Sequence, residues 1–395
     1  MRFGLPKAVK FGECKRTQNP EYAHYVSNPV SYGNIASADP ARPTAPGAMP
    51  AGKNAGERND FADFLKGALI LLVVWGHLIQ GAQSPSNHFY QDPVFKAIYM
   101  FHMPLFMAVS GYLSFRSISR LTLRECSRRR FLQVILPAIF WPATLTVICL
   151  AAFGIETGSI SGAYHKAHNL NLIMHPVLWF FWAVFGCTVV VGGMRKFEID
   201  RLQYFAVAAV LFLFAPDGAD LFLFKYVFPY FCLGYALARG DQIRLPDKMP
   251  WIGAVIALAA AAGCYWLWRN STYVYVGKTA LTAANLPDIG LRYVSGAAGS
   301  AAFVIVLRAV YGFARSQTLS AWGRGSLNIY AIHCVILAPV EAFFAPQIVS
   351  VWFSLFGAPV LAAVICWLTN LAGDGLGKVP VLGSLYFGKP WEKRH

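Results

Sequence analysis

A long apolar run that ends in a histidine constrains this chain more than any other sequence feature. Residues 61–77 read FADFLKGALILLVVWGH, and a second apolar run at residues 101–111, FHMPLFMAVSG, carries a histidine of its own. A helix that crosses a bilayer needs about 20 mostly apolar residues, so both runs suit membrane helices. Ionisable side chains at membrane depth are costly and usually face a protein interior or a water-filled cavity. His77 and His102 are therefore candidate functional residues.

The composition extends this interpretation to the whole chain. Of the 395 residues, 56% are hydrophobic and 13% are charged, whereas soluble domains carry roughly 25% charged residues. The formal net charge of +15 does not indicate nucleic-acid binding, because the basic residues fall in the gaps between apolar runs. We expect an integral membrane protein whose partners include the lipid bilayer and no nucleic acid.

Hydropathy predicts an all-α integral membrane protein, a bundle of about ten transmembrane helices. The fourth, fifth and sixth of these segments are short for a span. The ten predicted segments cover residues 61–81, 94–115, 131–153, 177–193, 201–215, 221–238, 251–268, 291–313, 326–345 and 348–372.

The distribution of lysine and arginine predicts how the bundle is oriented. With a cytoplasmic N-terminus, the cytoplasmic connections hold most basic residues, including six arginines between Arg116 and Arg130. Because cytoplasmic loops are enriched in such residues, both termini are predicted to be cytoplasmic. We expect a multi-pass protein of the plasma membrane, which is the inner membrane in a bacterium. The predicted parts are a disordered cytoplasmic N-terminal tail (1–58), a membrane domain (59–372) and a cytoplasmic C-terminal tail (373–395).

The first predicted helix has one polar face. Lys66 and His77 are eleven residues apart, about three turns, so they lie on the same face. Asp63, three residues before Lys66, can pair with it. Lys66 lies near the cytoplasmic end, and His77 lies about 16 Å further along the helix. A polar track therefore leads from the cytoplasm to an imidazole, and Asp63 is a candidate substrate-binding carboxylate.

Other ionisable groups in the predicted helices have competing interpretations. Counted from the helix ends, His77 and His102 reach a similar depth in the outer half of the membrane. Glu341 reaches a comparable depth and is a second candidate substrate-binding carboxylate. His102 could instead bond a carbonyl that Pro104 leaves free, and Glu341 could extend to the membrane surface. His333 lies nearer the cytoplasm, and we interpret it as structural rather than catalytic.

The sequence predicts no metal site. Its eight cysteines lie singly, without a Cys-x-x-Cys pair, which excludes a zinc knuckle or a paired redox motif. His165, His168 and His175 lie on a predicted outer loop with a spacing that does not favour a metal. The arginine-rich loop 116–130 suits phosphate instead, because guanidinium groups bind phosphate oxygens in pairs. A phosphorylated cytosolic donor is therefore a reasonable partner.

Several of these segments resemble the membrane-bound acyltransferase-3 family, and in particular its fucose 4-O-acetylase-like branch. The resemblance covers about residues 58–372, and its first two motifs together are the most specific. The matching segments are DFLKG (63–67), VVWGH (73–77), YMFHMPLF (99–106), SGY (110–112), RR (129–130) with LP (136–137) and Trp141, LWF (178–180), FPYFCLGY (228–235) and LSAWGRGSLNIYAIH (319–333).

The resemblance implies about ten membrane helices and transfer of an acyl group, usually acetyl, from a cytosolic acyl-CoA. The implied acceptor is a hydroxyl of a sugar, a polysaccharide or a lipid-linked glycan. His77 would be the catalytic histidine, and Lys66, where many relatives have arginine, would contribute to donor binding. Many relatives also carry Arg-x-x-Arg after the second helix. Here Gln133 follows Arg130 by three, so Arg129 and Arg130 are candidate donor contacts that lack this spacing.

The chemistry of O-acyl transfer suits these residues. It needs a base for the hydroxyl proton and a group that stabilises the tetrahedral oxyanion. A neutral imidazole can accept the proton, so we expect His77 to be the general base and His102 to orient the acceptor or stabilise the oxyanion. An acyl-histidine intermediate at His77 is the open alternative. Acetyl-CoA or another acyl-CoA is the expected donor, with no metal.

Two other classes of function compete with this interpretation. A secondary transporter or flippase could use the buried histidines as a proton relay, although no internal repeat supports this. A catalytically silent membrane scaffold would tolerate substitution of His77.

Overall fold

The computed structural model of the chain describes residues 60–83, 88–157, 159, 178–218, 221–241, 251–344 and 348–389. The chain divides into two units, residues 1–57 and residues 58–395, and every described residue belongs to the second unit. The predicted N-terminal tail therefore lies outside the described residues. The boundaries of the three predicted parts stay predictions.

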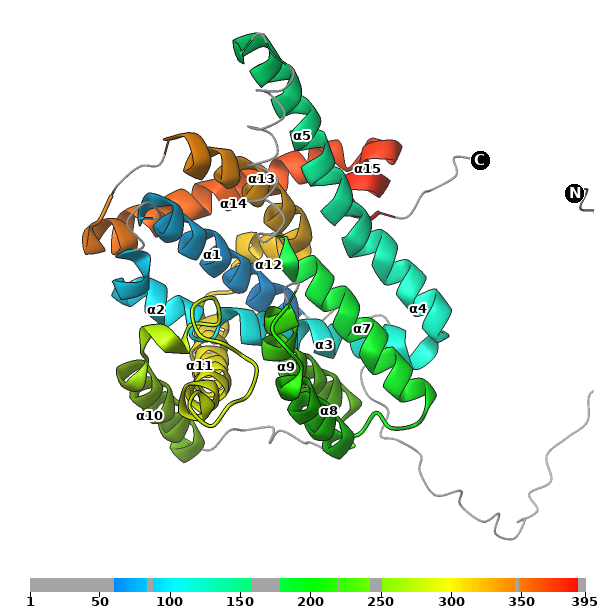
Figure 1. The fold of residues 1–395 in the computed structure, drawn as a ribbon, viewed down its shortest axis with the longest axis vertical. Helices are drawn as coiled ribbons and strands as arrows, with labels where there is room; N and C mark the ends of the chain where they lie inside the picture. Colours follow the sequence, from blue (N-terminus) through cyan, green and yellow to red (C-terminus); the bar gives the residue numbers. More distant parts are fainter. Residues whose placement is uncertain are drawn as a thin grey trace, which may run out of the picture. The chain divides into compact units, whose positions relative to one another are not determined.

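The described residues form helices and no strands (Figure 1). This confirms the all-α class. Six helical segments are long and apolar enough to cross a bilayer, as expected for a multi-pass membrane protein. They are α1 (Asp60–Gln83), α2 with α3 (Pro93–Arg120), α4 with the first part of α5 (Leu123–Ile148), α9 (Leu221–Arg239), α11 (Leu286–Phe313) and η5 with α14 (Phe353–Leu376).

Helices lie at all ten predicted positions, but only six of the described helical segments are long and apolar enough to cross a bilayer. Ten spans and cytoplasmic termini therefore stay predictions. The remaining bounds include two π-helical turns, η3 and η5, and two short 3₁₀ turns, η2 and η4. The elements are η2 (His88–Gln91), α2 (Pro93–Tyr99), α3 (His102–Arg120), α4 (Leu123–Arg130), η3 (Phe131–Ile135), α5 (Leu136–Thr157), α7 (Trp179–Lys196), α8 (Leu202–Phe214), α10 (Trp251–Leu267), η4 (Asn270–Thr272), α12 (Gln317–Arg324), α13 (Ser326–Phe344), η5 (Phe353–Gly357), α14 (Ala358–Leu376) and α15 (Pro380–Phe387).

The second predicted segment, 94–115, is two helices rather than one. Asp92 caps α2 by accepting hydrogen bonds from the backbone N–H groups of Val94 and Phe95, and Pro93 occupies the first turn. The chain then breaks, and α3 begins at His102 with Pro104 in its first turn. A proline is well tolerated in a first turn because the N–H it lacks has no partner within the helix there. His102 therefore lies at a helix start.

The arginine-rich stretch 116–130 is helical, not the loop that the sequence predicted. α3 continues to Arg120, and α4 begins only three residues later. Thr122 and Glu125 form a reciprocal capping box at this start, which satisfies backbone N–H groups that a helix start leaves free. The sequence predicted a loop because this stretch separates two apolar runs, and such a reading does not detect the helix cap.

The helix that carries His77 lies in the centre of the second unit. α1 contacts α2, α3, α11, α12, α13 and α14. In its most apolar stretch 72% of residues are buried, against 22% in the stretch Phe353–Leu376. A helix that is apolar apart from one polar face suits such a central position.

Glycines bring two pairs of helices into close contact. A Cβ atom on Gly67 would lie 1.8 Å from the Leu319 carbonyl oxygen of α12, and one on Gly323 would lie 1.7 Å from the Asp63 carbonyl oxygen of α1. Gly111 and Gly234 play the same part between α3 and α9. Small residues let helix backbones approach closely, which drives helix association in membranes.

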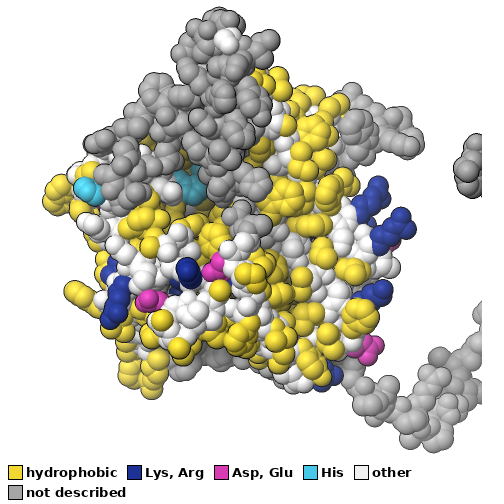
Figure 2. All heavy atoms as spheres, viewed as in Figure 1, with side chains coloured by type: hydrophobic (Ala, Val, Ile, Leu, Met, Phe, Trp, Pro, Cys, Tyr) yellow, Lys and Arg dark blue, Asp and Glu magenta, His cyan; other side chains and the backbone are white. Residues whose placement is uncertain are grey.

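The surface agrees with a bilayer environment. Figure 2 shows hydrophobic side chains spread widely over the described part of the face it draws, with Lys and Arg side chains mostly near its margins. Large apolar side chains such as Phe313 (94% exposed) and Trp266 (82% exposed) point outward. Soluble proteins rarely expose such extensive apolar surface, so lipid is its expected contact.

Candidate functional site

The centre of the candidate site is a pair of histidines from α1 and α13. The Nδ1 atom of His77 lies 3.0 Å from Nε2 of His333. The ring planes differ by 24° and the ring centroids lie 5.2 Å apart. Because the centroids are farther apart than the nitrogens by about two ring radii, the rings meet edge to edge, as a direct hydrogen bond requires. His333 is fully buried, whereas His77 is partly exposed.

The partners of these rings assign their tautomers. His333 Nδ1 lies 2.7 Å from the Ile329 carbonyl oxygen, which can only accept, so this nitrogen carries a proton. In neutral His333 the other nitrogen, Nε2, is then an acceptor, and His77 must donate from Nδ1. This leaves Nε2 of neutral His77 with a free lone pair. The arrangement can take up a proton at His77 and stabilise the resulting charge through the bond to His333.

The same place could hold a metal ion. Donor atoms of His77, His333 and Cys334 lie within 4.8 Å of one another, and two imidazoles with one thiolate suit Zn²⁺. The Cys334 Sγ atom lies 3.6 Å from His333 Nε2. The sequence predicted no metal and gave no signal for this set, because His77 is more than 250 residues away from the adjacent His333 and Cys334. The direct hydrogen bond between the two imidazoles accounts for their contact without an ion.

His102 lies near the histidine pair but does not bond it. Its Nδ1 atom donates to the Ile98 carbonyl oxygen over 2.8 Å, so Nε2 of neutral His102 is an acceptor. The His102 ring lies 4.7 Å, centre to centre, from the ring of Tyr99, and His77 is close enough to interact with it electrostatically. The observed partner is the carbonyl of Ile98, one turn before His102, and not one left free by Pro104.

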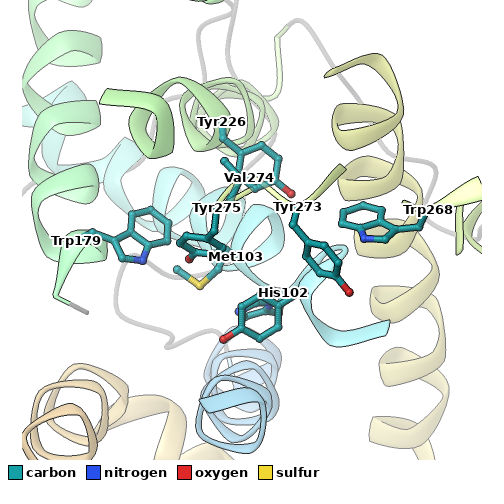
Figure 3. Close-up of a pocket in the computed structure, with 9 residues that line it drawn as sticks. His102, Met103, Trp179, Tyr226, Trp268, Tyr273, Val274 and Tyr275 are labelled. Atoms are coloured by element: carbon teal, nitrogen blue, oxygen red, sulfur yellow. The ribbon is translucent and has the colours of Figure 1, made fainter. Parts of the chain in front are cut away.

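His102 also lines a pocket walled mainly by aromatic rings (Figure 3). The rings come from α2, α7, α9 and the segment that follows α10, and the labelled ones lie above and beside His102 in the figure. The Tyr99 hydroxyl donates to Gln80 Oε1 over 3.0 Å, which ties the pocket to the His77 end of α1. His77 is not among the lining residues, which are Tyr99, His102, Met103, Trp179, Tyr226, Trp268, Tyr273, Val274 and Tyr275.

Lys66 and Asp63 lie at the other end of α1 and form the predicted pair, with Lys66 Nζ 3.7 Å from Asp63 Oδ1. Both side chains are largely buried, with exposed fractions of 18% and 11%. The N-terminal part of α1 packs against α12, where Gly323 faces the Asp63 carbonyl oxygen. Two motifs far apart in the sequence therefore meet around this ion pair.

The two candidate donor-binding arginines have different environments. Arg130 is partly buried, and its Nη2 atom donates to Ser114 Oγ over 2.7 Å. Arg129 is exposed. Glu341 belongs to α13, but its side chain lies outside the described residues, as do His165, His168 and His175.

The sequence interpretation missed two contributors to the site region. It placed His333 nearer the cytoplasm and interpreted it as structural, whereas His333 lies within 3.0 Å of His77 and bonds it. Asp92 was also missed: it accepts hydrogen bonds from Gln83 of α1 (3.2 Å) and Ser354 of η5 (2.6 Å). A conspicuous Asn-Ile-Tyr-Ala-Ile-His run pointed to His333, but Asp92 had no signal beyond its position before Pro93.

Comparisons with known proteins show which family the chain resembles. Residues 59–371 match a family described as an acyltransferase domain. Relatives described as nodulation protein NolL occur in Mesorhizobium japonicum, 35% identical over 236 residues (58% of this chain, 61% of that protein), and in Sinorhizobium fredii, 32% identical over 264 residues (66% and 70%). The match therefore spans less than two thirds of the Mesorhizobium protein. No solved structure matches the chain.

Proposed function

Because the chain belongs to the acyltransferase-3 family, and is thus an acyltransferase of groups other than aminoacyl groups, we propose that it is a membrane-embedded O-acyltransferase. The proposed donor is acetyl-CoA or another acyl-CoA. The proposed acceptor is a hydroxyl of a sugar, a polysaccharide or a lipid-linked glycan. The observation that carries the proposal is the hydrogen bond that directs the free lone pair of His77 away from His333.

In the proposed reaction His77 Nε2 takes the proton of the acceptor hydroxyl while the hydroxyl oxygen attacks the thioester carbonyl carbon. The tetrahedral intermediate collapses, the C–S bond breaks, and the proton passes from His77 to the departing thiolate. The products are an ester and free CoA thiol. General base catalysis of this kind typically contributes 10²–10⁴-fold. His333 is a positioning residue, because it keeps the proton of neutral His77 on Nδ1.

His102 is proposed to orient the acceptor. Of the two roles that the sequence left open, oxyanion stabilisation needs a donor. The Nδ1–H of His102 is already used by Ile98, so neutral His102 offers only an acceptor at Nε2. This favours a hydrogen bond from an acceptor hydroxyl to His102.

The proposed donor contacts are basic groups at the other end of the site. Arg129 is exposed and free to reach a phosphate, and a guanidinium binds phosphate oxygens in pairs. Lys66 is positioned by Asp63, which places Asp63 in a supporting role. Arg130 is partly committed to Ser114 and would contribute long-range charge.

The testing experiment measures transfer of radiolabelled acetyl groups from acetyl-CoA in membranes that contain the protein. Host glycan and lipid fractions serve as the acceptor pool. His77→Gln and His77→Ala should lose transfer at matched expression, while His88→Ala, which changes an exposed histidine outside α1, should retain it. Normal transfer by the His77 variants would refute the assignment of the base.

Donor binding separates this proposal from transport. An acyltransferase should be thermally stabilised by acetyl-CoA, because a ligand that binds only the folded state raises its stability. Absence of both stabilisation and transfer in the wild-type protein would instead support a transporter or flippase.

A further inference from the structure

The C-terminal helix folds back onto the helices that follow the arginine-rich stretch. α15 packs against α5 and η3, although it lies beyond the residues 59–371 that match the family. The Trp141 indole N–H of α5 donates to the Tyr386 carbonyl oxygen over 3.0 Å, and the hydroxyl oxygens of Tyr386 and Thr144 lie 2.5 Å apart. Phe387 is buried, and its ring lies edge to face with the ring of Trp141. These contacts fix α15 to α5.

A glycine after α15 brings the chain onto the backbone next to α4. Gly388 has a φ of +60°, a left-handed conformation that favours glycine. A Cβ atom on Gly388 would lie 2.5 Å from both the Cα atom and the carbonyl oxygen of Gln133, so the two backbones are in direct contact. Gln133 belongs to η3, which continues from α4, and it follows Arg129 by four residues. Gly388 therefore lies about one helical turn from the end of α4.

Lys389 follows this glycine and is held at both its backbone and its side chain. Its backbone N–H donates to the Gly383 carbonyl oxygen over 2.9 Å, and its Nζ atom donates to the Gly377 carbonyl oxygen over 3.1 Å. The side chain is exposed. An ammonium group has three N–H donors, so the bond to Gly377 leaves two of them for another acceptor. Lys389 thus presents a positive charge in a defined place.

Exposed basic side chains meet on this side of the molecule. Arg128 and Arg129 at the end of α4 are exposed, as Lys389 is. Lys and Arg side chains are seen along the right margin of Figure 2, the side on which α4 and α15 lie in Figure 1. Like charges repel each other, and an anion with several charged groups offsets this repulsion. The cluster is therefore complementary to a ligand with more than one phosphate group.

We propose that the C-terminal segment is part of the donor site and that Lys389 binds a phosphate group of the acyl-CoA together with Arg129. The proposal rests on the proposed acyltransferase function. Coenzyme A carries a pyrophosphate and a separate phosphate on its ribose, so one donor molecule offers phosphate oxygens to several basic residues. Lysine binds phosphate as a point charge, and arginine binds it with a fork of donors. α15 and Gly388 hold Lys389 at the site.

The first experiment tests the charge of Lys389. The full-length protein is reconstituted in phosphatidylcholine vesicles, and transfer from radiolabelled acetyl-CoA is measured with the host fraction that the wild-type protein labels. Lys389→Gln should raise the KM for acetyl-CoA about threefold to tenfold, as expected for one lost hydrogen bond, and leave kcat unchanged. Lys389→Arg keeps the charge and should stay near wild type. Lys278→Gln removes a charge from another exposed lysine and is the matched control.

Ionic strength supplies a readout that a purely structural role would not change. Salt screens exposed charges, with a Debye length of about 10 Å at 0.1 M and about 3 Å at 1 M. The ratio of the KM of Lys389→Gln to that of the wild-type protein should therefore approach one as the salt concentration rises.

A substitution of Gly388 tests the positioning of Lys389. In Gly388→Ala the new Cβ atom would meet the Gln133 backbone, so the segment has to move and the KM for acetyl-CoA should rise as it does in Lys389→Gln. Gly375→Ala meets nothing within 4 Å and should change neither KM nor kcat. The Tm of each variant without donor reports whether it is folded.

The outcomes distinguish this proposal from the proposed function. A wild-type protein without transfer refutes the function itself. A wild-type protein with transfer, together with an unchanged KM in Lys389→Gln, refutes the role of Lys389 alone. A KM ratio that does not respond to salt, or a lower kcat at constant KM, would also overturn it. An effect of Lys389→Gln that appears only in vesicles with added phosphatidylglycerol would mean that Lys389 binds a lipid phosphate instead of the donor.

Discussion

At the residue scale, the chemistry of His77 depends on the side chain that accepts its Nδ1–H. His333 holds that proton by a 3.0 Å hydrogen bond and is itself fixed by the Ile329 carbonyl oxygen. His333→Ala should therefore lower kcat for acetyl transfer by about 10- to 100-fold, the usual cost of losing a group that orients a site histidine. The KM for acetyl-CoA should not change. A kcat within twofold of wild type would contradict the positioning role.

Cys334 decides between a hydrogen-bonded pair and a metal centre. If His77, His333 and Cys334 held a metal ion, Cys334→Ala would remove one of three protein ligands and abolish activity. If the imidazoles bond each other directly, the variant should keep kcat within about threefold of wild type. Activity in the presence of a chelator and the metal content of the purified protein check the same point.

Substitution of Arg129 tests whether this residue binds the acyl-CoA donor. It is exposed at the end of α4, so Arg129→Gln should leave the fold intact and raise the KM for acetyl-CoA about 10-fold by removing a charge-assisted phosphate contact. Arg128→Gln, an exposed neighbour on the same helix, is the control. Equal KM values in both variants and wild type would mean that Arg129 does not bind the donor and only contributes to the positive charge of the cytoplasmic side.

The sequence predicted contacts between residues that are close together in the chain. Lys66 and Asp63 are three apart on one helix, and they pair as predicted. His333 was interpreted as structural because its depth was counted from an assumed helix end, and such counting cannot show that α1 and α13 bring two rings within 3.0 Å. Trp268 lies beside the segment that follows α10, and Arg292 donates hydrogen bonds to it. The path of this segment depends on tertiary contacts, so the positions of both residues were not predictable.

At the element scale, close contact between α1 and α12 depends on glycine. Gly67→Ala would put a Cβ atom 1.8 Å from the Leu319 carbonyl oxygen, so the helices would have to move apart. We expect a loss of about 1–3 kcal/mol of stability, as for other overpacked contacts, measured as a lower Tm in detergent. Gly81→Ala on the same helix meets nothing within 4 Å and should be neutral or stabilising by up to about 1 kcal/mol. Similar Tm values for both variants would contradict this packing.

Asp200 lies outside the spans and joins α7, α8 and α9, which makes the stability of their packing depend on pH. It follows α7, precedes α8, and accepts hydrogen bonds from Tyr235 (2.7 Å) and Arg195 (3.3 Å), and Arg239 Nη1 lies 2.8 Å from its carboxylate. Partial burial alone would raise the pKa of Asp200, but the hydrogen bonds from Tyr235 and Arg239 and the nearby charges lower it below its usual value. Its stabilising effect is therefore complete above the unfolded pKa of about 3.9 and is lost as pH falls through the folded pKa.

Substitution of Asp200 tests this effect. Asp200→Asn should destabilise the protein by about 1–3 kcal/mol at pH 7, because bonds to charged donors are lost. The difference from wild type should begin to shrink as the pH falls below about 4 and should disappear below the folded pKa of Asp200. Asp241→Asn is the control: Asp241 is half-exposed and pairs with Arg239, so its loss should cost less than about 1 kcal/mol. A pH-independent difference for Asp200→Asn would contradict the assigned linkage.

Hydropathy predicted the positions of the helices well and their interruptions poorly. Apolar runs report burial in lipid or protein, so each of the ten predicted segments contains a helix. Asp92 caps the start of α2, and Thr122 and Glu125 cap the start of α4, whereas no side chain caps α3 at the break before His102. These caps are local signals that a search for apolar runs does not read.

At the scale of the whole molecule, the site separates two kinds of binding group along α1. The ion pair of Lys66 and Asp63 lies at one end, and the aromatic pocket joins the other end through Gln80 and Tyr99. The sequence predicted this polarity only as a track from Lys66 to His77, because the pocket is built from helices that are distant in the chain.

The orientation of α11 determines which side of the membrane the aromatic pocket faces, and it can be measured. Lys278 and Gln317 are exposed and flank this helix, and the predicted topology puts Lys278 outside and Gln317 in the cytoplasm. In a background without other cysteines, a membrane-impermeant maleimide should label Lys278→Cys in intact cells and Gln317→Cys only after permeabilisation. The reverse pattern would turn the pocket toward the cytoplasm, so that donor phosphates would have to enter from the opposite face. Labelling of both cysteines from one side would mean that α11 does not span the bilayer. The predicted topology of this helix would then be wrong.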